Sequence, residues 1–157
     1  MSSSSGELSS REKQRALYAQ CRHPSGNLRP VNWQTPQQAI PDRIAAIARN
    51  TPNQLSVYDH DTSLTYSELD LAANRVANAI LADRGPGQEA VALLVGVDAP
   101  AFTAAPGTLK AGKIYVGLEV SFPPERSLQV LADAQVSLIV TDAKHLPLAQ
   151  ELAGSER

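Results

Sequence analysis

Few residues of this 157-residue chain have the types and the spacing of a catalytic or ligand-binding motif. The first candidate motif is the string at 107–113. GTLKAGK superficially fits a phosphate-binding loop, in which backbone N–H groups and a lysine surround phosphate oxygens. The next residue, however, is Ile114, where such a loop requires the hydroxyl that binds a metal ion. We therefore interpret Gly112 as the cap of a helix that precedes a strand.

Two histidines lie near other potential ligands. Cys21 and His23 are close in sequence, but no second pair at zinc-ligand spacing accompanies them, which favours a solvated segment. His60 lies between Asp59 and Asp61. Adjacent side chains in a turn point apart, so we interpret this string as a solvated turn and not as a catalytic group.

Glu119 is the one acid placed where open α/β sheets bind ligands, at the carboxyl end of a predicted strand. No phosphate loop accompanies it, so a structural role is the preferred interpretation. We therefore predict no catalytic, no cofactor-binding and no metal-binding residue in this chain.

The elements that would position such residues alternate along the second half of the chain. The apolar run that begins at Ala90 does not alternate with polar residues, which is typical of a fully buried strand. Three predicted strands and three predicted helices follow one another at 90–95, 100–110, 113–119, 124–134, 136–141 and 145–152. This order predicts a partial doubly wound α/β fold with about three parallel strands and right-handed crossover helices.

A short helix, a hairpin and a long helix are predicted ahead of that sheet. Apolar residues recur at helical spacing within 40–50, and the segments 54–58 and 63–66 suit two strands joined by a polar turn. Thr65 and Glu68 have the T-x-x-E spacing of a capping box, in which each side chain satisfies a free backbone N–H group. The apolar stripe that follows predicts an amphipathic helix.

Composition and charge exclude several classes of protein. Lys and Arg number 14 and Asp and Glu number 16, so no basic footprint for nucleic acid or an anionic membrane is present. Cys21 is the only cysteine and cannot form an internal disulfide. The longest apolar run, 90–97, is far short of the roughly 20 residues that span a membrane, and no signal peptide is recognisable. We expect a cytoplasmic protein that binds no nucleic acid and no membrane.

Two sequence blocks resemble a known enzyme family. LTYSELDLAANRVANAIL, at 64–81, resembles the first core motif of the adenylation domains of nonribosomal peptide synthetases and of their acyl-CoA-synthetase and luciferase relatives. LKAGKIYVGLEVSFPPER, at 109–126, resembles the second core motif. The resemblance covers about residues 40–142 and identifies the chain as a member of the adenylate-forming (AMP-dependent synthetase/ligase) superfamily.

The resemblance implies a reaction. Members of this family activate a carboxylic acid, often an amino acid, with ATP and Mg²⁺, and form an acyl-adenylate and pyrophosphate before transfer to a thiol. The family's phosphate loop ending in Pro-Lys-Gly, its Tyr-x-x-Thr-Glu and Thr-Gly-Asp segments and its C-terminal lysine lie further along, and none of these strings occurs here. ATP and Mg²⁺ are thus implied for a complete member, while we expect this chain alone to bind neither.

The chain departs from the family pattern at three positions. Gly117 and Val120 stand where the family usually carries prolines, so we expect a looser strand exit, because proline fixes φ. Pro106 instead falls within a helix that is uninterrupted in the family, and an interior proline costs about 3 kcal/mol. We expect a kinked or split helix there.

Two regions are predicted. Residues 1–36, with few apolar side chains, form a flexible N-terminal arm, and residues 37–157 form the incomplete N-terminal portion of an adenylation-type domain. The predicted function is an N-terminal fragment of an ATP-dependent, acyl-adenylate-forming ligase that is not active alone. Its partners would be the remainder of such an enzyme or a carrier-protein assembly line.

Two alternatives remain open. The missing motifs, Pro106 and Gly117 favour a truncated non-catalytic relative that acts as an interaction or scaffold module. A half-built sheet exposes strand edges, so such a module should self-associate or bind a protein partner. The other alternative is an independent nucleotide-binding α/β domain.

Overall fold

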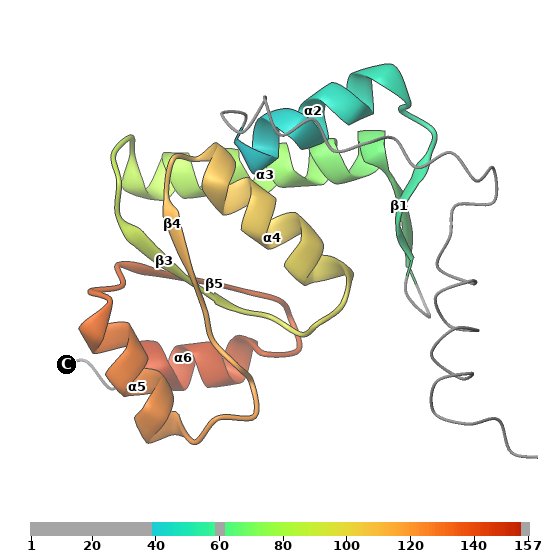
Figure 1. Cartoon of the computed structure of the whole chain (residues 1–157). Helices are drawn as coiled ribbons and strands as arrows, with labels where there is room; N and C mark the ends of the chain where they lie inside the picture. The colour runs from blue at the N-terminus through green and yellow to red at the C-terminus, as the bar shows by residue number, and fades with distance from the viewer. Residues whose placement is uncertain (1–38, 59–61, 155–157) are drawn as a thin grey trace, which may run out of the picture. The chain divides into compact units, whose positions relative to one another are not determined.

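The computed structural model describes residues 39–58 and 62–154, all within one compact unit. The predicted N-terminal arm, 1–36, lies outside the described residues. In chain order the elements are α2 (Ile40–Asn50), β1 (Leu55–Tyr58), β2 (Ser63–Thr65), α3 (Tyr66–Arg84), β3 (Ala90–Leu94), α4 (Ala99–Lys110), β4 (Ile114–Gly117), α5 (Pro124–Asp133), β5 (Leu138–Thr141) and α6 (Leu146–Gly154) (Figure 1). Among the described helices none is long and apolar enough to cross a membrane.

The predicted hairpin leads directly into the long helix α3. β1 and β2 pair antiparallel, and the predicted capping box forms where β2 ends. The Thr65 N–H donates to Glu68 Oε2 at 2.8 Å, and the Glu68 N–H donates to Thr65 Oγ1 at 3.3 Å. These bonds satisfy two backbone donors at the start of α3 and fix where the hairpin becomes a helix.

In the described part of the chain, a three-stranded parallel sheet has the order β4-β3-β5. The central strand β3 is apolar on both faces: Val91 and Leu93 pack with Ala104 of α4, whereas Ala92 and Leu94 pack with residues of α5 and α6. Helices α3 and α4 therefore cover one face, and α5 and α6 cover the other (Figure 1). The α/β fold with parallel strands and crossover helices is confirmed.

Gly107 brings α4 into close contact with α3. A Cβ added at Gly107 would lie 2.6 Å from Cβ of Val76 and 2.9 Å from the carbonyl oxygen of Ala73. Any side chain here would require the two helices to separate. The first glycine of GTLKAGK therefore serves helix packing.

Of the kinked or split helix expected at Pro106, the split is wrong, because α4 runs without interruption from Ala99 to Lys110 with Pro106 inside it. The kink stays a prediction. Pro106 and its neighbour Gly107 are both buried. Packing of α4 against α3 and the sheet offsets the loss of one helical hydrogen bond, and tertiary contacts commonly outweigh local helix preference.

Helix α4 ends in a turn that requires Gly112. The φ angle of Gly112 is 71°, in the left-handed region that glycine adopts without steric cost. Its N–H donates to the Leu109 carbonyl at 3.0 Å, and the Lys113 N–H donates to the Thr108 carbonyl at 3.1 Å. This pair of bonds is a Schellman motif, so Gly112 ends the helix as predicted and lies one residue beyond the cap, Ala111.

Candidate functional site

A pocket of about 640 Å³ lies at the carboxyl ends of the parallel strands, and we call it the carboxyl-edge pocket. The loops after the strands line it, with Gly96 and Asp98 after β3, Glu119 after β4, and Lys144 and His145 after β5. Open α/β sheets bind ligands at this edge. The structure therefore places Glu119 at the edge where the sequence predicted it.

Glu119 itself is exposed and loosely held. Its Oε1 accepts from the N–H of Ser121 at 3.5 Å and from the Ser121 hydroxyl at 3.4 Å. Bonds of this length are weak. They close a local turn after β4.

Asp142 and His145 form a bonded pair at this edge that the sequence interpretation missed. Asp142 Oδ1 accepts the His145 backbone N–H at 2.9 Å and lies 2.8 Å from His145 Nδ1, while Oδ2 accepts the Gly96 N–H at 3.4 Å. Burial raises the pKa of Asp142, but the bonds from the His145 backbone, from Gly96 and from the imidazole outweigh it, so that the pKa is lowered. The pair ties the loop after β5 to the loop after β3. An acid that follows a strand and precedes a histidine by three residues was the available signal.

Asp98 precedes α4 as its N-cap residue but makes no side-chain cap bond. Its Oδ1 is buried without a hydrogen-bond partner in the described structure. The carboxylate lies over Gly96, where an added Cβ would be 3.1 Å from both of its oxygens. Across the described residues, no group of three or more His, Cys, Asp or Glu side chains could hold a metal ion. The pocket wall therefore carries two acids, Asp98 and Glu119, beside Lys144 and His145.

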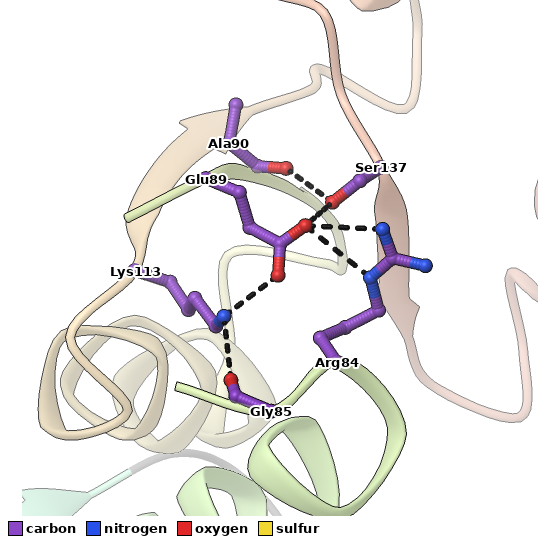
Figure 2. Close-up of polar contacts among 6 residues, drawn as sticks. All are labelled: Arg84, Gly85, Glu89, Ala90, Lys113 and Ser137. Carbon is purple, nitrogen blue, oxygen red and sulfur yellow. Dashed lines mark hydrogen bonds and ion pairs between the residues drawn. The ribbon is translucent and has the colours of Figure 1, made fainter. Parts of the chain in front are cut away.

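A second polar group, which we call the Glu89 cluster, lies at the opposite, amino end of the sheet (Figure 2). Glu89 Oε1 accepts from Lys113 Nζ at 2.6 Å, and Oε2 accepts from the Ser137 hydroxyl at 2.5 Å and from Arg84 Nη2 at 3.1 Å. Lys113 Nζ also donates to the carbonyl of Gly85 at 2.8 Å. The cluster therefore joins the end of α3 to the residues that precede β3, β4 and β5.

The geometry of the Glu89 cluster indicates a structural role. Bonds from Lys113, then Ser137, then Arg84 lower the pKa of Glu89 to about 2 and keep the carboxylate charged. The Lys113 side chain is only 1% exposed, so it cannot reach a ligand at the surface. The lysine of GTLKAGK thus holds strands together, and the string provides no phosphate loop.

Other sequence candidates lie outside the described residues. These are Cys21 and His23, and the Asp59–His60–Asp61 string. The predicted absence of catalytic, cofactor-binding and metal-binding residues stays a prediction.

Comparison with known proteins identifies the family. A family model described as AMP-binding enzyme matches residues 44–157. This chain belongs to the AMP-binding enzyme family. The isonitrile lipopeptide synthase of Mycobacterium tuberculosis is 39% identical over 119 residues, which make up 75% of this chain and 5% of that protein. The 3-hydroxybenzoate-CoA/4-hydroxybenzoate-CoA ligase of Thauera aromatica is 36% identical over 124 residues, which make up 76% of this chain and 24% of that protein.

Solved structures agree with the AMP-binding assignment. The anthranilate CoA ligase AuaEII, solved with anthranoyl-AMP, matches with a TM-score of 0.62 at 26% identity, over 71% of this chain and 22% of that one. A putative long-chain-fatty-acid CoA ligase from Rhodopseudomonas palustris shares the fold, with a TM-score of 0.67 at 18% identity over 75% of this chain and 30% of that one. This chain therefore spans less than a third of the length of these relatives.

The motif residues Gly107 and Lys113 and the acids at the carboxyl edge do not fit ATP and Mg²⁺, the groups that the family resemblance implies for a complete member. Lys113 is bonded within the Glu89 cluster, Gly107 is packed against Val76, and the acids at the carboxyl edge form no metal-binding group within the described residues.

Proposed function

We propose that this chain forms the N-terminal part of an ATP-dependent enzyme that activates an amino acid or another carboxylic acid as an acyl-adenylate. The match to the AMP-binding family over residues 44–157 is the observation that carries this proposal. A scaffold role fits the geometry, because the side chains that the family motifs supply hold helices and strands together. Activity would then reside in other parts of such an enzyme, and the chain alone would be inactive.

Residues of the two family-like blocks, and Gly107 just before the second block, have packing or capping roles that support this proposal. Thr65 and Glu68 start α3, Gly107 seats α4 on α3, Gly112 ends α4, and Lys113 binds Glu89. These residues determine where β3 and β4 lie. A sheet positioned in this way can carry a catalytic loop without contributing a catalytic group itself.

Two measurements test the proposal. The first is carboxylate-dependent exchange of pyrophosphate into ATP by the chain alone, with amino acids and benzoates as substrates. We expect no exchange, and measurable exchange would show that the chain carries a catalytic apparatus of its own.

The second measurement uses the Thauera ligase, whose matching segment of 124 residues can be replaced by this chain. If the role is scaffolding, the chimera keeps 3-hydroxybenzoate-dependent pyrophosphate exchange. The same chimera with Gly107→Val should lose it, because the helices α3 and α4 are forced apart. A folded chimera without exchange would contradict the proposal.

One observation favours the alternative of a non-catalytic interaction module. The edge strand β4 exposes two large apolar side chains, Ile114 at 55% and Tyr115 at 47%. An open edge of this kind binds other chains readily. Sedimentation of the chain as a compact monomer at all concentrations would exclude self-association and weaken this alternative.

A further inference from the structure

The carboxyl-edge pocket combines apolar walls with an acidic group that has no partner. Its volume of about 640 Å³ lies in the range of small-molecule sites. The loops after β3 and β4 supply its apolar lining, which consists of Val95, Val97, Leu118, Val120 and Phe122. Sites for small organic molecules commonly combine apolar walls with a few polar groups that fix the orientation of the ligand. The polar groups of this pocket therefore indicate what it would bind.

Asp98 is the acid without a partner. Its Oδ1 is buried and accepts no hydrogen bond within the described structure. Its Oδ2 has no donor among the described residues either, yet it is not buried, so it is open to the pocket that Asp98 lines. A carboxylate with neither oxygen bonded to a donor is unfavourable in a partly buried position. A charged donor that enters the pocket would remove this cost.

The charges around the pocket are mostly negative. Glu119 lines the same pocket and is held only by weak local bonds. Asp142 lies next to the pocket, because it bonds to the lining residue His145. His145 and Lys144 are the basic residues of the lining, and Nδ1 of His145 is already bonded to Asp142. Three acids, with Asp98, thus surround one lysine, and such a field favours a cationic ligand.

Phe122 gives the pocket an aromatic wall of fixed orientation. The guanidinium carbon of Arg126 lies 4.3 Å from the centroid of its ring. Arg126 is not among the lining residues, so its charge stacks on the ring and does not point into the pocket lining. This contact restrains the ring. An apolar ligand would therefore meet a wall that is already in place.

We infer that the carboxyl-edge pocket binds a primary ammonium group carried on an apolar body, of the kind found in arylalkylamines. An ammonium group has three donors, so it can bond Asp98 Oδ2 and the Glu119 carboxylate together. The apolar body would contact Val97, Leu118 and Phe122. Such binding goes beyond the proposed function, because it requires no catalytic group and no other part of an enzyme.

Lys144 distinguishes a simple amine from an amino acid. It is exposed, follows β5, and its ammonium group has no partner in the described structure. β3 lies between β4 and β5, so Lys144 lies across the pocket from Glu119. A ligand with a carboxylate would bind Lys144, whereas the charge of a simple amine is repelled by it. Removal of Lys144 should therefore strengthen amine binding and weaken amino acid binding.

Titrations followed by the backbone amide resonances of the isotopically labelled full chain test the inference. The probes are 2-phenylethylamine, 3-phenylpropionate, which lacks the ammonium group, and L-phenylalanine, which carries both groups. We expect 2-phenylethylamine to shift the amides of Val97, Glu119 and Val120 saturably, because these residues line the pocket. We expect no saturable shift with 3-phenylpropionate, because the acids of the pocket repel it.

Charge variants locate the ammonium group. Asp98→Asn should weaken binding of 2-phenylethylamine about tenfold, since it removes a charged hydrogen bond. Asp133→Asn, at the exposed end of α5, removes the same charge away from the pocket and should leave binding unchanged. Glu119→Gln provides a second, exposed site that is tolerated if Asp98→Asn does not fold, with about threefold weaker binding. Lys144→Ala should strengthen binding about twofold.

Three results would overturn the inference. The first is the absence of saturable shifts with 2-phenylethylamine, and the second is unchanged binding by folded Asp98→Asn and Glu119→Gln variants. The third is tighter binding of L-phenylalanine that Lys144→Ala abolishes, which would assign the pocket to a zwitterion. Pyrophosphate exchange by the chain and by the Thauera chimera is measured separately, so failure of amine binding leaves the proposed function intact.

Discussion

Glu89 accepts hydrogen bonds from more donor atoms than any other acidic side chain whose contacts the structure describes. Ammonium, hydroxyl and guanidinium groups from three separate segments converge on its two oxygens. Charged hydrogen bonds of this kind are stronger than neutral ones. The carboxylate is consequently the point through which the amino ends of three strands are coupled.

The lowered pKa of Glu89 predicts a loss of stability in acid. Its ordinary pKa is 4.5 and its folded value is about 2, so the folded state favours the carboxylate. Its contribution is present above pH 4.5 and is lost as the pH falls toward 2. We expect Glu89→Gln to lower the unfolding temperature at pH 7, with a difference from wild type that narrows between pH 4.5 and 2.

Thermal unfolding monitored by circular dichroism across this pH range measures the effect. Glu125→Gln, at the exposed start of α5, removes the same charge away from the Glu89 cluster and serves as control. A Glu89→Gln curve parallel to wild type at every pH would show that the cluster does not couple folding to protonation.

Gln135 predicts a stabilising substitution. It follows α5 with φ at 50°, and Val136 completes the same kind of helix-ending turn by donating to the Leu131 carbonyl at 3.0 Å. A residue with a side chain loses about 1 to 2 kcal/mol of stability at positive φ. Glycine avoids this steric cost, but it loses more conformational entropy on folding, which offsets part of the gain. We expect Gln135→Gly to raise the free energy of unfolding by about 0.5 to 1 kcal/mol in urea titrations.

The neighbouring residue provides the opposite control. Ala134 has a φ of −85° in the right-handed helical region, where glycine has no steric advantage. Ala134→Gly should therefore lower stability. If both glycine variants change stability in the same direction, backbone conformation is not the cause.

At the scale of elements, two glycines near β4 should respond to alanine in opposite ways. Gly107→Ala places a Cβ 2.6 Å from Val76 and 2.9 Å from the backbone of α3, so we expect a loss of about 1 to 2 kcal/mol. Gly117→Ala meets no atom within 4 Å and lies outside the left-handed region, so we expect a gain of about 0.5 kcal/mol. Urea unfolding of both variants checks the signs, and a stabilised Gly107→Ala variant would contradict the close helix approach.

The elements themselves were largely predictable from the sequence. Hydrophobic periodicity and local caps identified the order of strands and helices, because apolar residues such as Val91 and Leu94 mark the faces on which the elements pack. Pro106 shows the limit of local rules. Its cost is local, but the packing that offsets it comes from α3, which lies more than twenty residues earlier in the chain.

At the scale of the whole molecule, the site was predictable only in part. Glu119 could be placed at the carboxyl edge because its position follows from one predicted strand. The pair of Asp142 with His145 depends on the loop after β3, and the Glu89 cluster depends on four segments brought together by the sheet order. Such contacts follow from tertiary arrangement, which no single stretch of sequence specifies.

The open edge of β4 leads to a prediction about association. Lys113, the charge next to this strand, is turned inward to Glu89 and does not protect the edge. We expect the chain to form larger species as its concentration rises, and Ile114→Lys to reduce them, because charged side chains on edge strands oppose pairing. Phe102→Lys is a matched control, since Phe102 is exposed to the same 55% but lies on a helix. Sedimentation velocity measures the fraction of larger species formed by each variant. An equal reduction of this fraction by both variants would assign the association to exposed apolar surface in general. A reduction by Ile114→Lys alone would assign it to the strand edge.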